Sequence, residues 1–285
     1  MVKCYQMKKI LLALDALSPD KAAIDFACYL ASLTDSLLTG VFLENLVADQ
    51  EPVLKKTAGA AYIKWEIDKD SKEYKDKCTK TEAHIAEFER ACYVHNVRFG
   101  IHRDEGTPVA EMIRESRYAD VLIVDADTSF HKRYEGVPSG FVRELLRDAE
   151  CPVIIAPGDF YSIDELIFTY DNSKSAAFAL KQFTYLFPAL SDKKVTILQV
   201  NKTGAWQEDE KAGLRGWLQH NYSSIGFQAL KGDEQDAFFT FLSGRKNAFI
   251  VMGAYGRNAL SRFFHESTAD LIIKIITRPL FIAHL

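Results

Sequence analysis

One order of segments occurs twice along this chain of 285 residues, and that repeat constrains the fold more than any other feature. In each copy an apolar stretch ends near an aspartate, Asp15 or Asp171, just before a segment typical of a helix. A glycine before a second helix follows, Gly106 or Gly232. Each copy then closes with an apolar run, a polar loop, a helix, a proline and a last apolar run. Three anchors in the same order make an internal repeat, and the alternation of strands with helices predicts parallel sheets.

The last unit of the second copy suits a phosphate. An apolar run at 248–252 predicts a buried strand, and Gly253 and Gly256 follow it. Glycine lets the backbone take a positive φ or approach a ligand closely. A helix is predicted to begin at Ser267 and a strand to follow at 280–283. Doubly wound folds hold phosphates with this order of strand, glycine loop and helix N-terminus.

The remaining elements follow from apolar runs and helix start signals. Ser18 is expected to cap the first helix, and Thr107 to cap a later one that has Pro108 in its first turn. Residues 47–61 predict a loop or a short helix, before a long charged helix at 63–94. The other predicted strands lie at 9–14, 37–43, 97–102, 121–124, 153–156, 166–169 and 195–200, and the other helices at 18–33, 139–149 and 175–187.

This pattern resembles the universal stress protein family, in a tandem form with two such domains in one chain. The resemblance covers nearly the whole length and implies two doubly wound parallel-sheet α/β domains, 1–158 and 159–285, of the Rossmann-like, adenine nucleotide alpha hydrolase-like type. In that family the final strand of each domain pairs across a dimer axis, which also hides a strand edge. Residues 153–156 and 280–283 are therefore expected to pair within the chain as an internal pseudo-dimer. The link at 160–165 is short enough to pack the halves together.

The family's phosphate loop reads G-x-x-G, nine residues, then G-[ST], and an aspartate after the first strand holds the adenosine end of ATP. In the second half, Glu266 replaces the third glycine. The region after this half's second strand is also about thirty residues shorter than in the first half, which opens the crevice. By resemblance the candidate ATP-binding residues are Asp171, Val200, Gly253, Gly256, Arg257, Asn258 and Ser267, with Asp15 as a residue of the same kind in the first half.

Glu266 argues against ATP. Two like charges about 4 Å apart repel by about 4 kcal/mol at an effective dielectric constant of about 20. That repulsion would cancel much of the contribution of the helix N-terminus, unless the side chain turns away. In the alternative interpretation, Gly253 and Gly256 only make a tight turn while Glu266 complements the helix dipole.

The first half departs further from the family pattern. Asp125 and Thr128 stand where its loop glycines belong, and Ser139-Gly140 replaces Gly-Ser. An acidic loop without glycines does not favour phosphate. For this half, a bound cation is the alternative to a phosphate. Carboxylates such as those of Asp15, Asp125 and Asp127 are ligands that Mg²⁺ accepts.

Composition excludes several classes of protein. A net charge of −4 and a pI of about 6.0 leave no basic footprint for nucleic acid. No apolar stretch approaches the roughly 20 residues of a membrane span. Five cysteines without a C-x-x-C pair fit a reducing compartment, with Cys28 and Cys151 as core residues. We therefore expect a cytoplasmic protein.

No hydrolase motif accompanies the repeat: G-x-S-x-G, G-x-x-x-x-G-K-[ST] and H-E-x-x-H are absent, and His131 and His265 read as exposed loop residues. The favoured hypothesis is a stress-response protein that acts by binding a ligand or protein partner, without catalysis, with ATP binding lost or weak. The first alternative is a regulatory switch that binds ATP in the second half. The second is a weak ATP hydrolase. Association of two chains is a further expectation that the sequence leaves open.

Overall fold

A computed structural model describes residues 8–45, 51–57, 60–104, 106–131, 134–232, 234–253 and 277–283, and for 51–57, 60–66, 234–236 and 239 it describes the backbone alone. The first half contains β1 (Lys9–Asp15), α1 (Lys21–Thr34), β2 (Leu37–Leu43), β3 (Glu51–Thr57), β4 (Ala60–Glu66), α2 (Lys72–Val94), β5 (Phe99–Asp104), α3 (Pro108–Ser116), β6 (Val121–Asp125), α4 (Gly140–Asp148) and β7 (Val153–Ala156). The second half contains β8 (Glu165–Thr169), α5 (Lys174–Leu186), a 3₁₀ turn (Pro188–Leu190), β9 (Lys194–Asn201), α6 (Glu208–Leu218), β10 (Ile225–Lys231), α7 (Glu234–Leu242), β11 (Ala248–Gly253) and β12 (Leu280–Ala283).

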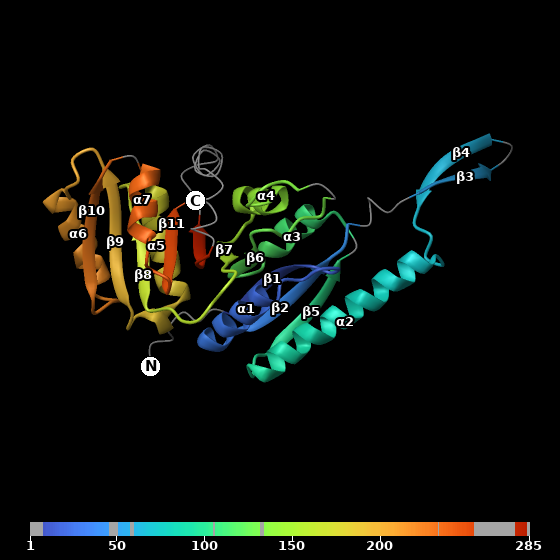
Figure 1. Cartoon of the computed structure of the whole chain (residues 1–285), viewed down its shortest axis with the longest axis horizontal. Helices are drawn as coiled ribbons and strands as arrows, with labels where there is room; N and C mark the ends of the chain where they lie inside the picture. Colours follow the sequence, from blue (N-terminus) through green and yellow to red (C-terminus); the bar gives the residue numbers. More distant parts are fainter. Residues whose placement is uncertain are drawn as a thin grey trace.

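A single ten-stranded sheet runs through both halves, in the order β10-β9-β8-β11-β12-β7-β6-β1-β2-β5 (Figure 1). Outward from its centre, the first half presents β7-β6-β1-β2-β5 and the second presents β12-β11-β8-β9-β10, which is the same order of equivalent strands. Neighbours within each half are parallel. At the centre β12 and β7 are antiparallel, with Leu280 opposite Ile155 and Phe281 opposite Ile154. The tandem doubly wound fold and its internal pseudo-dimer are confirmed.

Helices cover both faces of the sheet. One core cluster joins it to α1, α2, α5 and α6, and the other joins it to α3, α4 and α7. Strands β6, β7, β11 and β12 are buried along nearly their whole length. Burial on both faces explains their almost uninterrupted apolar sequences, as is usual for parallel strands.

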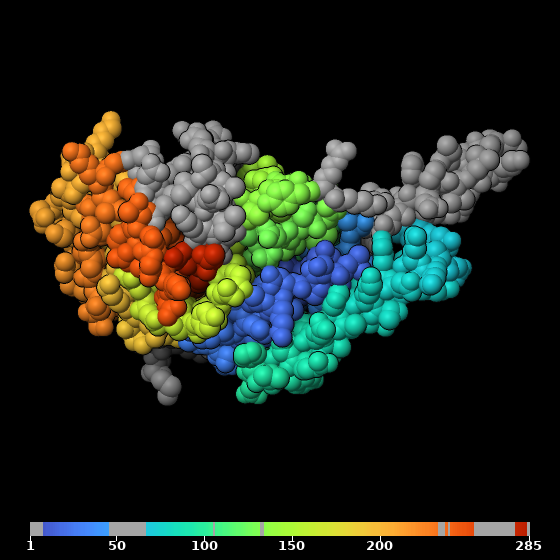
Figure 2. Space-filling model, in the orientation of Figure 1, coloured from blue at the N-terminus to red at the C-terminus, as the bar shows by residue number. Residues whose placement is uncertain are grey.

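The segment between the halves packs against the first helix, as its length predicted. The ring of Phe160 lies 5.0 Å from that of Phe26 and 4.7 Å from that of Tyr29, both in α1. Phe26 in turn contacts Phe249 of β11 at 6.3 Å. In the space-filling view the segment, yellow-green, lies directly against the blue first half (Figure 2). The division at 158 and 159 stays a prediction.

Two helix caps differ from expectation. Asp20, and not Ser18, caps α1, because its Oδ1 accepts a hydrogen bond from the backbone nitrogen of Ala23 at 3.1 Å. Thr107 does precede Pro108 and α3, but its side chain makes no capping hydrogen bond.

The structure corrects the interpretation of residues 47–66. Residues 51–57 and 60–66 form an antiparallel hairpin, β3–β4, in place of a loop and a helix start. The sequence of β4, AAYIKWE, is rich in types that favour strands, whereas the charge-rich stretch after it dominated the helix prediction. The long helix begins only at Lys72, after Ser71 as cap. The hairpin stands away from the sheet at the end of the molecule (Figure 1).

Candidate functional site

Three of the predicted residues of the second half meet at one edge of the sheet. Asp171 follows β8, Val200 lies near the end of β9 and Gly253 ends β11. Since β8 lies between β9 and β11, the carboxyl ends of these parallel strands are neighbours. Ligands of open α/β sheets bind at such an edge. The edge is therefore the candidate site.

The aspartates of the two halves adopt the same local geometry. Asp171 is exposed, and its Oδ1 accepts a hydrogen bond from the backbone nitrogen of Ser173 at 3.0 Å. Asp15 accepts one from the backbone nitrogen of Leu17 at 2.9 Å, again two residues further on. Burial raises the pKa of Asp15, despite the hydrogen bonds that it accepts. The two positions are structurally equivalent, and Asp171 is the more open to a ligand.

Gly253 is required by close packing. A Cβ at this position would lie 2.5 Å from the backbone nitrogen of Ala176 and 2.5 Å from the carbonyl carbon of Ser175, in the first turn of α5. Real Cβ atoms do not approach backbone so closely, so the strand end can lie against α5 only with glycine. The other candidate residues of this loop, Gly256, Arg257, Asn258 and Ser267, lie outside the described residues together with Glu266.

In the first half the same edge is acidic. Asp15 ends β1, Glu44 follows β2 and Asp125 ends β6. Burial, helped by the negative charge of Asp20, raises the pKa of Asp125 to about 6. The described residues include no group of three His, Cys, Asp or Glu side chains placed to hold a metal ion, so the Mg²⁺ alternative gains no geometric support.

Helix α2 forms a wall beside this acidic edge. Thr81 of α2 donates a hydrogen bond to the Glu44 carboxylate at 3.3 Å, and Arg103 of β5 contacts the same Oε1 through Nε at 3.1 Å and Nη2 at 3.0 Å. His84, also from α2, bonds through Nδ1 to the carbonyl oxygen of Ala16 at 2.8 Å. Through these contacts, Thr81, Arg103 and His84 form hydrogen bonds with other groups of the protein.

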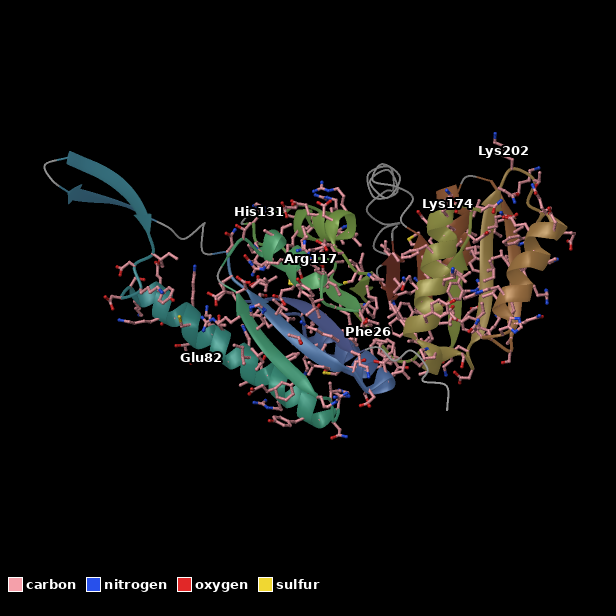
Figure 3. The ribbon with its side chains drawn as sticks, turned by 180° about the vertical axis from the view of Figure 1, so that it is seen from behind. Phe26, Glu82, Arg117, His131, Lys174 and Lys202 are labelled. Carbon is pink, nitrogen blue, oxygen red and sulfur yellow. The ribbon has the colours of Figure 1, made fainter. Side chains whose placement is uncertain are left out.

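The N-terminus of α4 already holds an anion that belongs to the chain. The Oε2 atom of Glu135 accepts a hydrogen bond from the backbone nitrogen of Gly140 at 3.1 Å and another from Ser129 Oγ at 2.9 Å. Ser139 caps the same helix by accepting from the backbone nitrogen of Val142 at 3.2 Å. Figure 3 places His131 on the loop that leads to this helix. The Nε2 atom of His131 lies 3.7 Å from Glu135 Oε1, so this side chain contacts another residue of the same loop.

Sequence reasoning missed Glu135. A carboxylate a few residues before a predicted helix is a recognisable signal, because the unpaired N–H groups of a helix N-terminus attract anions. The glutamate lies five positions before Gly140, however, and it reaches the helix only through the intervening turn.

A cavity of about 410 Å³ lies beside Asp171, between α5 and α6. It begins at Tyr170 and Asn172, on either side of that aspartate, and continues along Leu180, Leu214 and Trp217. α6, which forms one side of this cavity, has 11 residues. The residues that line this cavity were not predicted as a site.

Comparisons with known proteins bear on the family. No family model matches the chain. A universal stress protein from Synechocystis is 23% identical over 164 residues, which are 56% of this chain and 56% of that protein, so the match spans only about half of the relative. A universal stress protein from Archaeoglobus fulgidus superposes with a TM-score of 0.70 and 18% identity, over 98% of this chain and 99% of its own.

The chain therefore has the tandem universal stress protein fold. A functionally unknown protein from Pseudomonas aeruginosa shares this fold at a TM-score of 0.55, with 10% identity over 98% of this chain and 92% of its own. The tandem universal stress protein fold accounts for the equivalent strand orders of the two halves and for the place of Asp15 and Asp171. Within the described residues, no helix is long and apolar enough to cross a membrane.

Proposed function

We propose that this chain is a cytoplasmic stress-response protein that acts by binding a ligand or a protein partner, without catalysis, and in which ATP binding is lost or weak. The similarity to universal stress proteins supports a function of the stress-response type. The finer parts of the proposal rest on the two carboxyl edges of the sheet.

The contact between Glu135 and Gly140 carries the proposal. A phosphate at the start of α4 would compete with a carboxylate that already accepts hydrogen bonds from Gly140 and Ser129. Hydrogen bonds to charged groups contribute about 1.5–3 kcal/mol each. A phosphate group must either displace this carboxylate or lie next to it and meet its charge.

Neighbouring acids act in the same direction. Asp15 and Asp125 stand at the ends of the adjacent strands β1 and β6, whereas Arg103 balances the charge of Glu44 at the end of β2. Each ionised carboxylate adds repulsion to a triphosphate that approaches this edge. The first half therefore suits a neutral or cationic group, or a partner surface, better than a nucleotide.

A switch that binds ATP in the second half is the second candidate. Asp171 is exposed at the edge and keeps the turn geometry of Asp15. The cavity next to it leaves space for a ligand. Against this stands the electrostatic argument from Glu266, which follows from the sequence.

Equilibrium dialysis with labelled ATP and Mg²⁺ separates the two candidates. We expect wild type to bind no more tightly than about 1 mM, an affinity worth about 4 kcal/mol. Micromolar binding would overturn the proposal, and the switch would replace it. Asp15→Ala and Asp171→Ala then assign the site, since the variant that loses binding identifies the half. Glu266→Gly, compared with wild type, tests whether this carboxylate weakens the second site.

A phosphate-release assay on the same samples addresses the hydrolase alternative. We expect no release above the Asp171→Ala background. Release from wild type but not from Asp171→Ala would contradict the non-catalytic part of the proposal.

The net charge of −4 favours partners other than nucleic acid, and a second chain is one candidate partner. Mass measurement during gel filtration tests that association.

A further inference from the structure

Two cysteines from different helices meet in the core of the first half. Cys28 of α1 and Cys92 of α2 are both fully buried, and their sulfur atoms lie 3.8 Å apart, within hydrogen-bond distance for thiols. A disulfide has sulfur atoms about 2.05 Å apart. The two sulfur atoms therefore have to move about 1.8 Å closer for a bond to form.

The packing of α2 holds this pair in register. Phe88 lies one turn before Cys92 on the same face of α2, and its ring packs against Gly40 of β2, where a Cβ would lie 2.9 Å from Cζ. Phe88 also contacts Phe42 at 5.8 Å and Phe99 at 6.0 Å. With Phe88 anchored against the sheet, the last turns of α2 keep Cys92 opposite Cys28.

We propose that Cys28 and Cys92 form a dithiol modification site, which a small peroxide converts into an intramolecular disulfide between α1 and α2. In the closed structure the hydrogen bond between the two thiols lowers the pKa of Cys92. Cys92 lies on α2, the helix that has to open, so it is the thiol that a peroxide reaches first and the one that attacks. The pKa of Cys28 is raised, first by that hydrogen bond and then by burial, and it stays protonated.

The reaction balances in two steps. The Cys92 thiolate attacks one peroxide oxygen, the O–O bond breaks and Cys92 becomes a sulfenic acid. The other oxygen leaves as hydroxide and becomes water by taking up the proton that the Cys92 thiol released. Cys28 then attacks the Cys92 sulfur, and its thiol proton passes to the hydroxyl group that leaves. The S–O bond breaks, the S–S bond forms and a second water is released. The two thiols lose two electrons together, and the peroxide gains them.

Access to the buried pair requires α2 to open locally. The helix has 23 residues, of which only Thr81, Phe88 and Cys92 are buried. Elements with few buried contacts open at low free energy. Once formed, the disulfide holds α2 against α1, and with it the wall that presents Thr81 and His84 to the acidic edge.

Peptide mapping of the intact, reduced chain after hydrogen peroxide treatment tests the proposal. Free thiols are alkylated in denaturant and the protein is digested with trypsin without reduction. We expect a cross-linked pair of peptides spanning 22–55 and 91–98, and a loss of 2 Da from the intact mass. Hydrogen exchange in α2 is expected to slow after oxidation and to recover with reductant.

Cys151 is the matched control, because it is also buried but lies in the core cluster on the other face of the sheet. Cys151→Ala should form the cross-link as wild type does, whereas Cys28→Ala and Cys92→Ala should not. The proposal is overturned if oxidised wild type lacks the cross-link, if the link forms only in denaturant, or if another pairing dominates. The wild-type map decides even if a variant folds poorly.

Discussion

Glu135 Oε2 lies 3.1 Å from the backbone nitrogen of Gly140, at the N-terminus of α4. In a doubly wound fold this position suits the phosphate of a bound ligand, because it combines free N–H groups with the positive end of the helix dipole. Here a side chain of the same chain supplies the anion. In the first half this position is therefore taken by a contact within the chain.

Glu135→Gln is expected to lower the free energy of unfolding by about 1 kcal/mol. Glutamine keeps an acceptor oxygen for Gly140 and Ser129 but loses the charge that complements the helix dipole. Urea denaturation at low ionic strength measures the change, and added salt should reduce it because salt screens the dipole interaction.

Glu144→Gln serves as the control for this substitution, since Glu144 is an exposed glutamate within the same helix. Its loss should change the unfolding free energy by less than about 0.5 kcal/mol. Equal effects at Glu135 and Glu144 would show that the N-terminal contact has no special stabilising role.

Asp125→Asn is expected to stabilise the protein at neutral pH. Burial raises the pKa of Asp125 to about 6 in the folded chain, above the value of about 3.9 in an unfolded one. The folded state thus binds more protons between pH 4 and pH 6, and the stability contributed by this group is lost as pH rises through that window. At pH 7 the variant should be more stable by up to about 3 kcal/mol.

The measurement is the difference in unfolding free energy between variant and wild type at pH 4, 5, 6 and 7. Asparagine keeps an oxygen that can accept the hydrogen bond now made by the backbone nitrogen of Asp127 at 3.0 Å. Asp127→Asn is the control, because Asp127 is exposed. Its difference in unfolding free energy from wild type should be smaller and should vary less with pH. A difference for Asp125→Asn that does not vary with pH would refute the assignment.

Much of the fold follows from local sequence. The strands at 37–43, 153–156 and 280–283 were predicted with the bounds that the structure shows. They are buried on both faces, so their apolar runs begin and end with the strand. The repeat then determined the topology, since equivalent segments in the same order take equivalent places on the two sides of the antiparallel β7–β12 pair.

The site was less predictable, because its contacts join residues that no periodicity connects. The carboxylate of Glu135 reaches Gly140 across a turn, and the cavity beside Asp171 depends on how α6 lies against α5. The hairpin at 51–66 was missed because its two strands pair with one another in a separate two-stranded sheet, outside the repeat of strands and helices that guided the prediction.

Gly253→Ala is expected to destabilise the chain by about 1–3 kcal/mol, the usual cost of overpacking a close contact. The new Cβ would meet the backbone of Ser175 and Ala176 at the start of α5, and backbone cannot turn aside as a side chain can. Gly213→Ala is the control, because a Cβ there meets nothing within 4 Å and alanine favours the helix by about 1 kcal/mol. Thermal unfolding of the two variants should therefore shift in opposite directions. A neutral Gly253→Ala would show that the strand end can move away from α5.

Ile154→Ala tests whether the halves unfold together. Ile154 of β7 is fully buried and faces Phe281 of β12 across the central pair of strands, so its truncation should cost about 2–5 kcal/mol. In a Trp65→Phe background, Trp206 and Trp217 report on the second half only, while far-UV circular dichroism reports on the whole chain. Because one sheet connects the halves, a change made in the first half should shift both signals by the same amount of urea.

Ile101→Ala in the outer strand β5, where the side chain is 38% exposed, should shift them little. A tryptophan transition that stays in place while the dichroism transition moves would mean that the halves unfold independently, and that the β7–β12 pairing transmits no stability between them.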